Sequence, residues 1–481
     1  MALEHLSPSL LWKHFEKLCS IPRPSGHERQ AAAYVVSEAQ RLGLESYTDA
    51  IGNVIVRKEA SPGFENRGGV ILQSHLDMVP QKNEGTDHDF LKDPINPYID
   101  GEWVKARGTT LGADNGIGVA AALAVLEDKE LRHGPLEALF TIDEESGMTG
   151  ALNLQPGVLE GKTLINLDTE HEGEIFIGCA GGIDAQIKLP VSYENAASEM
   201  VPLGIAVKGL KGGHSGIDID LGRGNAIKIL TRFLYISLSR FDFRICSIRG
   251  GSVRNAIPRE AFCSVMLPRE QVDSFCNSSE QFELVVKSEL SLSDPGVSVV
   301  MSSAVESLPV LTSKSQLALL RSLYACPNGV IRMSDRVIGV VETSSNLAII
   351  KNHDDYIEVQ CLLRSSIDTA RDDLCCAVES AFESNGASVA FTGAYPGWIP
   401  DPEASVLKVM KRVYAALFGE EPEIKVVHAG LECGIIGAKY PQMELVSIGP
   451  TMRSPHSPDE CLQIDTVDKF WRFLVGTLKE V

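Results

Sequence analysis

In Val70-Ile-Leu-Gln-Ser-His75-Leu-Asp77, an apolar run passes directly into a histidine and an acid, and this is the sharpest local signal in the chain. Residues 70–73 have the composition of a buried strand. Side chains at positions i and i+2 of an extended segment point to the same face, so His75 and Asp77 can act together. A carboxylate behind a metal-binding imidazole fixes its tautomer and raises its basicity. Taken alone, the pair is also compatible with two polar loop residues.

Three more apolar runs end in the same way. They are residues 136–142, which lead into Asp143-Glu144-Glu145; residues 163–167, which lead into Asp168; and residues 445–448, which lead into a proline-rich loop with His456. Three adjacent acids repel one another unless a cation lies nearby. Each of these segments alone is equally compatible with an ordinary solvated loop.

A glycine-rich segment, Gly108-Thr-Thr-Leu-Gly-Ala-Asp114-Asn-Gly-Ile-Gly118, surrounds one carboxylate at a strand-to-helix junction. Glycine lets the backbone approach a ligand closely. A phosphate-binding loop is the first alternative, but the Gly-Lys-Ser/Thr ending is missing and Asp114 would repel phosphate. A plain tight turn is the second alternative.

Strands that alternate with helices over residues 1–182 indicate an α/β sheet covered on both faces. Ligands of such sheets bind beyond the carboxyl ends of the strands. The sequence therefore predicts that five side chains converge there: His75, Asp114, Glu145, Asp168 and His456. Two imidazoles and three carboxylates suit two zinc-like ions with one bridging carboxylate.

The pattern changes after Gly181-Gly182, where strands and helices follow the order of ferredoxin-like α+β sandwiches. It returns to α/β after Tyr395-Pro-Gly-Trp-Ile-Pro400. We therefore predict a mixed-sheet, three-layer catalytic domain over residues 1–182 and 394–481, with an inserted α+β lid or dimerisation domain over residues 183–393. Near the N-terminus, Ser25 and Glu28 have the spacing of a capping box for a helix that ends near Gly43.

The composition excludes several classes of protein. The chain of 481 residues has a net charge of −20, which disfavours nucleic acid as a partner. Its 11 cysteines include no Cys-x-x-Cys pair, which argues against a disulfide framework and a cysteine zinc site and favours the cytoplasm. Neither a signal peptide nor an apolar run of about 18 residues is found, so no membrane association is expected.

The motifs resemble those of the aminoacyl-histidine dipeptidases, within the co-catalytic zinc peptidases that include carnosinase, aminoacylase and tripeptidase T. The resemblance runs from Ile21-Pro-Arg-Pro-Ser-Gly to the end of the chain. Its most specific stretches are Gln73-Ser-His-Leu-Asp-Met-Val, Thr110-Leu-Gly-Ala-Asp-Asn-Gly, Asp143-Glu-Glu-Ser-Gly-Met-Thr-Gly, His428-Ala-Gly-Leu-Glu-Cys-Gly and Pro455-His-Ser-Pro-Asp-Glu.

The resemblance implies a role for each position. His75 and Asp168 would hold one divalent ion, Glu145 and His456 the other, and Asp114 would bridge them. Zinc is the first choice of metal, and cobalt or manganese is compatible with the same ligands. Asp77 would orient His75, and Glu144 would be the general base.

The resemblance also suggests four substrate-binding residues. His214, within Lys211-Gly-Gly-His-Ser-Gly, would stabilise the oxyanion from the lid. Asn225 and Arg364 would hold the substrate carboxylate, since a guanidinium binds carboxylates in a bidentate manner. Glu432 would bind the substrate's free amine. Arg364 is also compatible with an ordinary surface arginine.

The expected activity is hydrolysis of dipeptides, of Xaa-His or broad specificity. A tripeptidase or an N-acyl-amino-acid deacylase of similar chemistry is the nearest alternative. A catalytically silent binding protein is the alternative from another class, and the intact Glu144 and ligand set speak against it. Small peptides are the expected partners, and a homodimer through the lid domain is compatible with the sequence.

Overall fold

The computed structural model describes residues 3, 5–303 and 309–481. The chain divides into two units. The first contains Met1–Cys179, Trp398–Val426 and Leu431–Val481, and the second contains Ala180–Gly397 and Val427–Gly430. The second unit is thus an insertion into the sequence of the first. The catalytic role of residues 1–182 and 394–481 and the lid role of residues 183–393 remain predictions.

The first unit is built on an eight-stranded sheet in the order β1-β2-β6-β3-β7-β23-β8-β22. Its strands are β1 (Glu45–Thr48), β2 (Val54–Lys58), β3 (Val70–His75), β6 (Leu136–Thr141), β7 (Thr163–Asn166), β8 (Glu174–Cys179), β22 (Glu423–Val427) and β23 (Glu444–Ser447). The four neighbours β6, β3, β7 and β23 run parallel. Their carboxyl ends therefore meet at one edge of the sheet, which is where the predicted ligands follow in the sequence.

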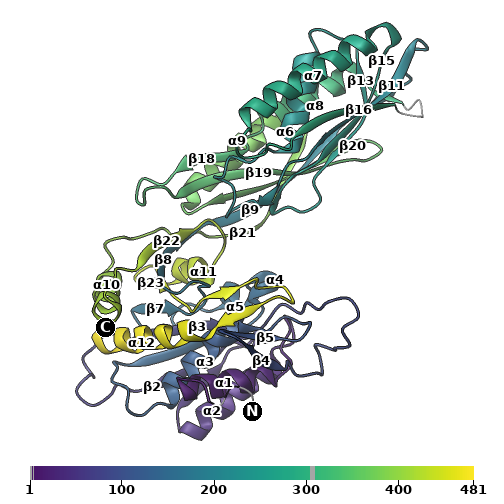
Figure 1. The fold of residues 1–481 in the computed structure, drawn as a ribbon. Helices are drawn as coiled ribbons and strands as arrows, with labels where there is room; N and C mark the ends of the chain where they lie inside the picture. The colour runs from purple at the N-terminus through teal and green to yellow at the C-terminus, as the bar shows by residue number, and fades with distance from the viewer. Residues whose placement is uncertain (1–2, 4, 304–308) are drawn as a thin grey trace. The chain divides into compact units, whose positions relative to one another are not determined.

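Helices flank this sheet (Figure 1). They are α1 (Ser9–Cys19), α2 (Arg29–Leu42), α3 (Ala113–Glu127), α4 (Glu144–Gly147), α5 (Thr149–Asn153), α10 (Ser405–Phe418), α11 (Glu432–Lys439) and α12 (Ile464–Glu480). The small side chains of α3 are almost all buried, because this helix packs between β3 and α1. A four-stranded sheet, β24-β25-β5-β4, combines β4 (Pro97–Asp100), β5 (Trp103–Ala106), β24 (Met452–Arg453) and β25 (Cys461–Gln463).

The second unit contains a nine-stranded sheet in the order β16-β11-β15-β13-β19-β20-β9-β21, with β18 also paired to β19. The strands are β9 (Gly181–Pro190), β11 (Met200–Lys208), β13 (Arg244–Gly250), β15 (Ala261–Pro268), β16 (Ser298–Ser303), β18 (Gly329–Met333), β19 (Val341–Asn352), β20 (Tyr356–Ser365) and β21 (Ser388–Tyr395). The strand pairings described in this sheet are antiparallel. The unit also has two small two-stranded sheets. In one, β10 (Tyr193–Glu194) pairs with β17 (Val310–Leu311), and in the other, β12 (Gly213–His214) pairs with β14 (Ala256–Ile257).

Four helices pack on one face of the nine-stranded sheet (Figure 1). They are α6 (Ala226–Ser237), α7 (Val272–Glu289), α8 (Ser313–Ala325) and α9 (Asp368–Glu383). Alternation of buried and exposed side chains along β9 is the pattern of a sheet with one covered face. The core between sheet and helices is aliphatic with a cluster of phenylalanines around Phe233 and Phe275.

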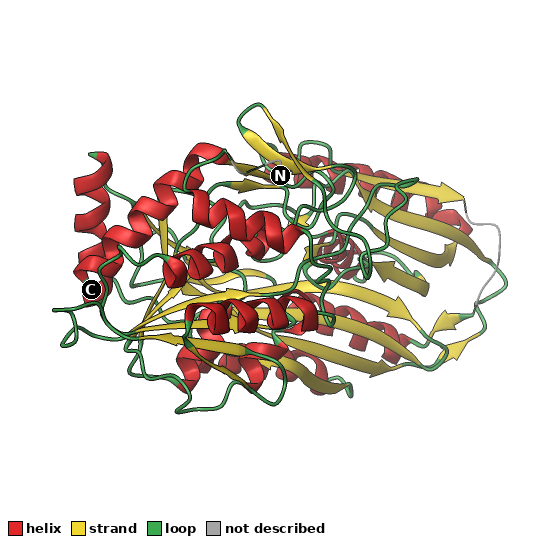
Figure 2. Cartoon of the chain, turned by 90° about the horizontal axis from the view of Figure 1, so that it is seen from below, coloured by secondary structure: helices red, strands yellow, loops and turns green. Residues whose placement is uncertain are grey.

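The predicted fold class is confirmed: one unit has a mixed sheet between helices, and the inserted unit is an open-faced α+β sandwich. Figure 2, coloured by secondary structure, shows helices and strands combined throughout. Among the described residues, we find no helix whose length and apolar character would let it span a bilayer.

Candidate active site

The five predicted metal ligands meet at one end of the first unit. Asp114 lies between the two histidines: its Oδ1 is 3.1 Å from Nε2 of His75, and its Oδ2 is 3.2 Å from Nε2 of His456. Nε2 of His75 is also 3.5 Å from Oδ1 of Asp168, and Nε2 of His456 is 2.9 Å from Oε2 of Glu145. The structure thus brings the ligands together as two histidine–carboxylate pairs that share Asp114.

These distances fit a pair of zinc-like ions. Zinc binds imidazole nitrogen and carboxylate oxygen at about 2.0–2.2 Å, so two ligand atoms at a tetrahedral ion lie about 3.3 Å apart. The four N···O distances, from 2.9 to 3.5 Å, bracket that value. A buried oxygen, Oε1 of Glu145, also has no hydrogen-bond partner among the described residues. The donor set therefore fits two divalent ions with Asp114 between them.

The electrostatics of the cluster also favour cations. Burial raises the pKa of Asp168 to about 7; His75 opposes this shift and Asp114 adds to it. Burial and the nearby carboxylates raise the pKa of Glu145. Burial lowers the pKa of His75, but the surrounding carboxylates more than offset this and raise it well above the ordinary value. The carboxylates repel one another and attract positive charge, which a proton or a metal ion can supply.

Asp77 connects three parts of the site. Its Oδ1 lies 3.3 Å from Nδ1 of His75, which leaves Nε2 facing the other carboxylates. The same carboxylate accepts hydrogen bonds from the backbone N–H of Glu144 at 3.0 Å and of Glu145 at 3.1 Å. Burial raises the pKa of Asp77, but His75 outweighs this and lowers it to about 2. Asp77 is therefore an ionised group that can orient both the imidazole and the turn carrying the two glutamates.

The predicted capping box at Ser25 is wrong. Ser25 Oγ donates to Oδ2 of Asp77 at 2.8 Å, and Glu28 precedes α2 without a side-chain cap. Glu28 instead accepts from the backbone N–H of Gly26 and of Asp143. The local spacing was compatible with a cap, but a partner distant in sequence offered the hydroxyl a buried anionic acceptor.

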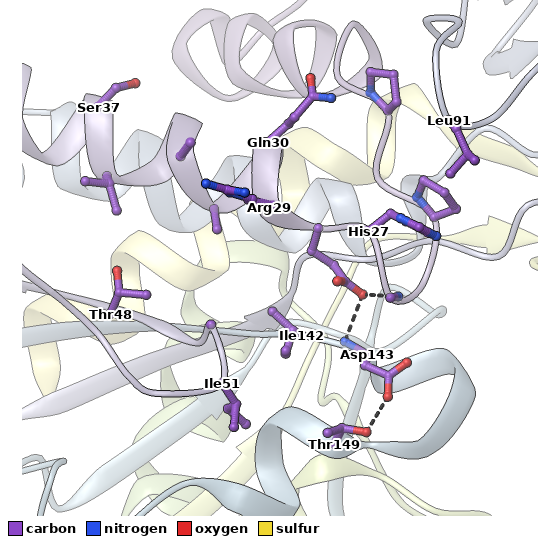
Figure 3. A pocket seen from close by; sticks show the side chains of 18 of the residues that line it. His27, Arg29, Gln30, Ser37, Thr48, Ile51, Leu91, Ile142, Asp143 and Thr149 are labelled. Carbon is purple, nitrogen blue, oxygen red and sulfur yellow. Dashed lines mark hydrogen bonds between the residues drawn. The ribbon is translucent and has the colours of Figure 1, made fainter.

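The three adjacent acids point in different directions. Asp143 has a left-handed backbone (φ 53°), which turns the chain between the end of β6 and α4. Its carboxylate accepts a hydrogen bond from Thr149 and lines a surface cavity of about 1010 Å³ beside α2 (Figure 3). The predicted metal ligands do not line that cavity. Asp143 thus faces away from the metal ligands, and Glu144 and Glu145 are left to serve the site.

Glu144 is half-buried, and its carboxylate makes no hydrogen bond within the described part of the chain. Burial raises its pKa well above the ordinary value; His75 opposes this, and Asp168, Glu145 and Glu432 add to it. A carboxylate with a raised pKa is a better proton acceptor than an ordinary carboxylate. This is the chemistry that a general base requires.

Glu432 is buried below the strand ends. Its Oε2 accepts from Nε2 of Gln73 at 2.6 Å and from Oγ1 of Thr141 at 2.7 Å, and its Oε1 has no partner among the described residues. Gln73 in turn accepts from Asn166, which accepts from Ser447. Sequence reasoning missed the connection of Glu432 to this polar chain, although Gln73, Asn166 and Ser447 lie in the strands that lead to the ligands.

The second unit contains its own polar cluster. Nδ1 of His214 accepts from the backbone N–H of Gly216 and Ile217 at 3.2 and 3.1 Å, so its Nε2 carries the hydrogen. Arg364 is 5% exposed and donates from Nη1 to the Tyr395 hydroxyl at 3.1 Å, while its Nε has no partner among the described residues. Burial and then the positive charge of Arg364 lower the pKa of His214.

Asn225 has a structural role. Its side-chain oxygen caps α6 by accepting from the backbone N–H of Ile227 and Lys228. Its Nδ2 donates to Asn328 and to the carbonyl of Leu347. All of its hydrogen-bonding groups are thus engaged, and we leave Asn225 out of the substrate site that we propose.

His428, which lies in the second unit, is expected to make the protein sensitive to acid. Burial and then Arg364 lower the pKa of His428 to about 3, and its Nε2 lies 2.7 Å from Oγ of Ser344. The unfolded chain protonates this imidazole near pH ~6.5. Its stabilising contribution is therefore complete above that pH and is lost as the pH falls towards about 3.

Urea unfolding at about pH 7 and about pH 5 measures this effect. His428→Gln should remove up to about 2 kcal/mol of the stability loss that wild type shows between these values. The exposed His27 provides the control, since His27→Gln should leave the loss as in wild type. An acid sensitivity unchanged in His428→Gln would contradict the expectation.

A second group of possible ligands, His14, Glu38 and Glu127, joins α1, α2 and α3. Lys13 and Arg41 already pair with Glu127 at 2.9 Å each, and Nε2 of His14 donates to the same carboxylate at 2.8 Å. Because two cationic side chains neutralise these acids, we interpret the group as an interhelical ion-pair network.

Comparison with known proteins identifies the family of this chain. The chain matches the family described as Peptidase family M20/M25/M40 over residues 71–480. It is 48% identical over 479 residues to the cytosol non-specific dipeptidase of Escherichia coli K12, which covers 100% of this chain and 99% of that protein.

Solved structures give the same result. The crystal structure of aminoacylhistidine dipeptidase from Vibrio alginolyticus is 48% identical, with a TM-score of 0.95 and coverage of 100% of this chain and 98% of that one. Aminopeptidase PepT from Bacillus cereus, 18% identical with a TM-score of 0.58 and 99% coverage of both chains, shares the fold. The predicted resemblance is confirmed, and the chain belongs to Peptidase family M20/M25/M40.

Proposed function

We propose that this protein is a metallo-dipeptidase. The observation that carries the proposal is the position of Asp114, with one oxygen toward His75 and the other toward His456. Identity of 48% over the full length to a protein named cytosol non-specific dipeptidase supports the substrate class. Xaa-His dipeptides or dipeptides of broad specificity are the substrates that we infer.

We assign His75 and Asp168 to one ion and Glu145 and His456 to the other, with Asp114 shared. His75, Asp114 and Glu145 also lie close enough together to share one ion, but the shortest distance to Glu145 comes from His456. Zinc is the metal that we propose, and cobalt or manganese suits the same donors. When bound, two divalent ions polarise the scissile carbonyl and lower the pKa of water.

Glu144 acts as the base in this proposal. Its carboxylate takes a proton from the attacking water and later donates it to the leaving amine. Asp77 orients both groups for this reaction, since its carboxylate contacts the imidazole of His75 and accepts a hydrogen bond from the backbone N–H of Glu144. A covalent acyl-enzyme is not required, so no serine or cysteine nucleophile is assigned.

Arg364 and His214 are the proposed substrate-binding groups of the second unit. Arg364 is buried, and among the described residues no acidic side chain forms an ion pair with it, so an anionic ligand such as a substrate carboxylate would satisfy it. The Nε2–H of His214 is a donor suited to an oxygen that becomes negative during the reaction. We also keep Glu432 as the group for the substrate amine, because its Oε1 has no hydrogen-bond partner among the described residues.

The remaining proposals concern the setting of the reaction. We infer a cytoplasmic location, in keeping with buried free thiols such as Cys263, Cys361 and Cys433. A homodimer formed through residues 183–393 is the proposed assembly.

A substrate panel tests the proposed activity. Zinc-loaded protein is assayed with dipeptides, tripeptides and N-acyl amino acids, and each assay is repeated after chelation and after reloading with metal. Dipeptides should be hydrolysed at least about tenfold faster, in kcat/KM, than the other two classes, and chelation should abolish the reaction reversibly. Preference for tripeptides or acyl amino acids would support the alternatives instead. Zinc-bound protein without activity on any amide would favour the binding-protein alternative.

A further inference from the structure

The loop of residues 111–114, which carries Asp114, is held by one buried carboxylate. Oε2 of Glu460 accepts hydrogen bonds from the first two backbone N–H groups of this loop, at 2.7 and 2.9 Å. Oε1 of Glu460 accepts from the last two, at 2.7 and 3.3 Å. Glu460 is 2% exposed, so these bonds form where water does not compete. A single side chain therefore orders four consecutive peptide groups.

Arg23 also binds this loop, through a backbone carbonyl. One terminal nitrogen donates to the backbone carbonyls of Leu76 and Asp77 at 3.0 and 2.8 Å, and the other donates to the carbonyl of Gly112. The guanidinium thereby ties the segment after His75 to the loop before Asp114. Arg23 and Glu460 are both buried and attract each other by their opposite charges.

Gly112 shows how closely the loop of residues 111–114 packs against Arg23. Its φ of +71° lies in the left-handed region, and a Cβ atom there would come within 2.7 Å of a terminal nitrogen of Arg23. A side chain would therefore be strained and would push the guanidinium away. Glycine at this position therefore allows the loop to pass close to Arg23.

We propose that Glu460 is a positioning residue of the metal centre, which fixes Asp114 between His75 and His456. Glu460 follows His456 in the same loop, so its carboxylate joins the segment of one ligand to the segment of the shared ligand. It acts through Asp114 and does not itself face the ligand atoms. The inference rests on the proposed two-metal function.

Hydrogen–deuterium exchange of the metal-free, full-length protein tests the local part of this inference. Glu460→Gln keeps the size of the side chain but leaves one acceptor oxygen for the four N–H groups. One pair of loop amides, either the first or the second, should then exchange at least about tenfold faster. This readout does not depend on metal or on activity.

Zinc titration of the same proteins tests the effect on the metal centre. Loss of a group that orients a ligand usually costs about 10–100-fold in metal affinity, and we expect this loss for at least one of the two ions in Glu460→Gln. Glu460→Asp, which keeps the charge but is one methylene shorter, should bind zinc more tightly than Glu460→Gln. Such rescue by the conservative variant separates a positioning role from general destabilisation.

Glu137 provides a matched control. It is 6% exposed, and its Oε2 accepts from the backbone N–H of Glu160 and Gly161 at 2.8 Å each. It lies opposite Ile71, toward the end of β3 that is remote from the ligands. Glu137→Gln should speed exchange around residues 160–161 and leave zinc affinity unchanged.

Two results would overturn the inference: wild-type loop exchange together with wild-type zinc affinity in Glu460→Gln, or an equal loss of zinc affinity in Glu137→Gln. Should Glu460→Gln fail to fold, Glu460→Asp decides the matter by the same two measurements. A wild-type protein that binds zinc but does not hydrolyse dipeptides would contradict the proposed function, and the exchange and affinity results would still stand.

Discussion

Replacing Glu144 with Gln is expected to lower kcat for dipeptide hydrolysis by about 10²–10⁴-fold, the range of general acid–base catalysis. The amide of Gln has nearly the shape of the carboxylate but cannot accept the proton. Because Glu144 is not among the five assigned ligands, both ions should remain bound. Steady-state kinetics with wild-type and variant protein, each checked for metal content by elemental analysis, measure the effect.

Asp143 offers an adjacent acid as the control for this variant. Its carboxylate bonds to Thr149 and faces the cavity beside α2, and asparagine tolerates its left-handed backbone. Asp143→Asn should therefore keep kcat within a few-fold of wild type. Full activity of Glu144→Gln with both metals bound would sink the assignment of the base. A large loss of kcat in Asp143→Asn would show that activity depends on the whole turn of residues 143–145 and not on the position of Glu144 alone.

Replacing Asp114 with Asn is expected to weaken binding of both ions together, by more than about 100-fold, because the loss should exceed the ~10–100-fold cost of removing a group that only orients a ligand. Asp114 is the acid whose two oxygens face the two histidines, at 3.1 and 3.2 Å. An asparagine presents one neutral oxygen and one NH₂ group, so it cannot replace the charge or serve both ions. Hydrolysis should be lost at metal concentrations that saturate the wild type.

Zinc titration by calorimetry measures this prediction, and Glu170→Gln is its control. Glu170 is a half-buried acid near the site. Burial, Asp114 and Asp168 raise the pKa of Glu170 to about 7, yet we assign this residue to neither ion. Glu170→Gln should still bind two ions. Retention of two tightly bound ions by Asp114→Asn would contradict the shared ligand, and loss of an ion in Glu170→Gln would add a ligand to the set.

The strand ends were the part of the site that local sequence could predict. Apolar runs that pass directly into His75 or Asp168 became the buried parallel strands β3 and β7, since burial on both faces requires apolar residues. Asp114 was predicted to join these ligands, although its glycine-rich loop was also compatible with a tight turn, and the resemblance to known peptidases added only its bridging role. The structure places that loop at the same edge as the strand ends.

Other residues could not be predicted, because their partners lie far away in the sequence. Ser25 has the spacing of a helix cap, but the structure directs its hydroxyl to Asp77. Glu460 is the last residue of a motif that drew attention only to its histidine, and its four bonds reach a loop 346 or more positions away. Local patterns report which face of an element is buried, but they do not report which distant backbone groups lack a partner.

Residue type and periodicity were enough to predict the chemistry of the donors and the strands that carry them, and the motifs were enough to predict the family. The folded structure was needed to show that the two oxygens of Asp114 face His75 and His456, that Asp143 faces away from Glu144, and that Asn225 caps a helix. The physical reason is that residue type and periodicity follow from local burial, whereas distances of about 3 Å between ligand atoms depend on how the whole sheet, its loops and their buried charges pack together.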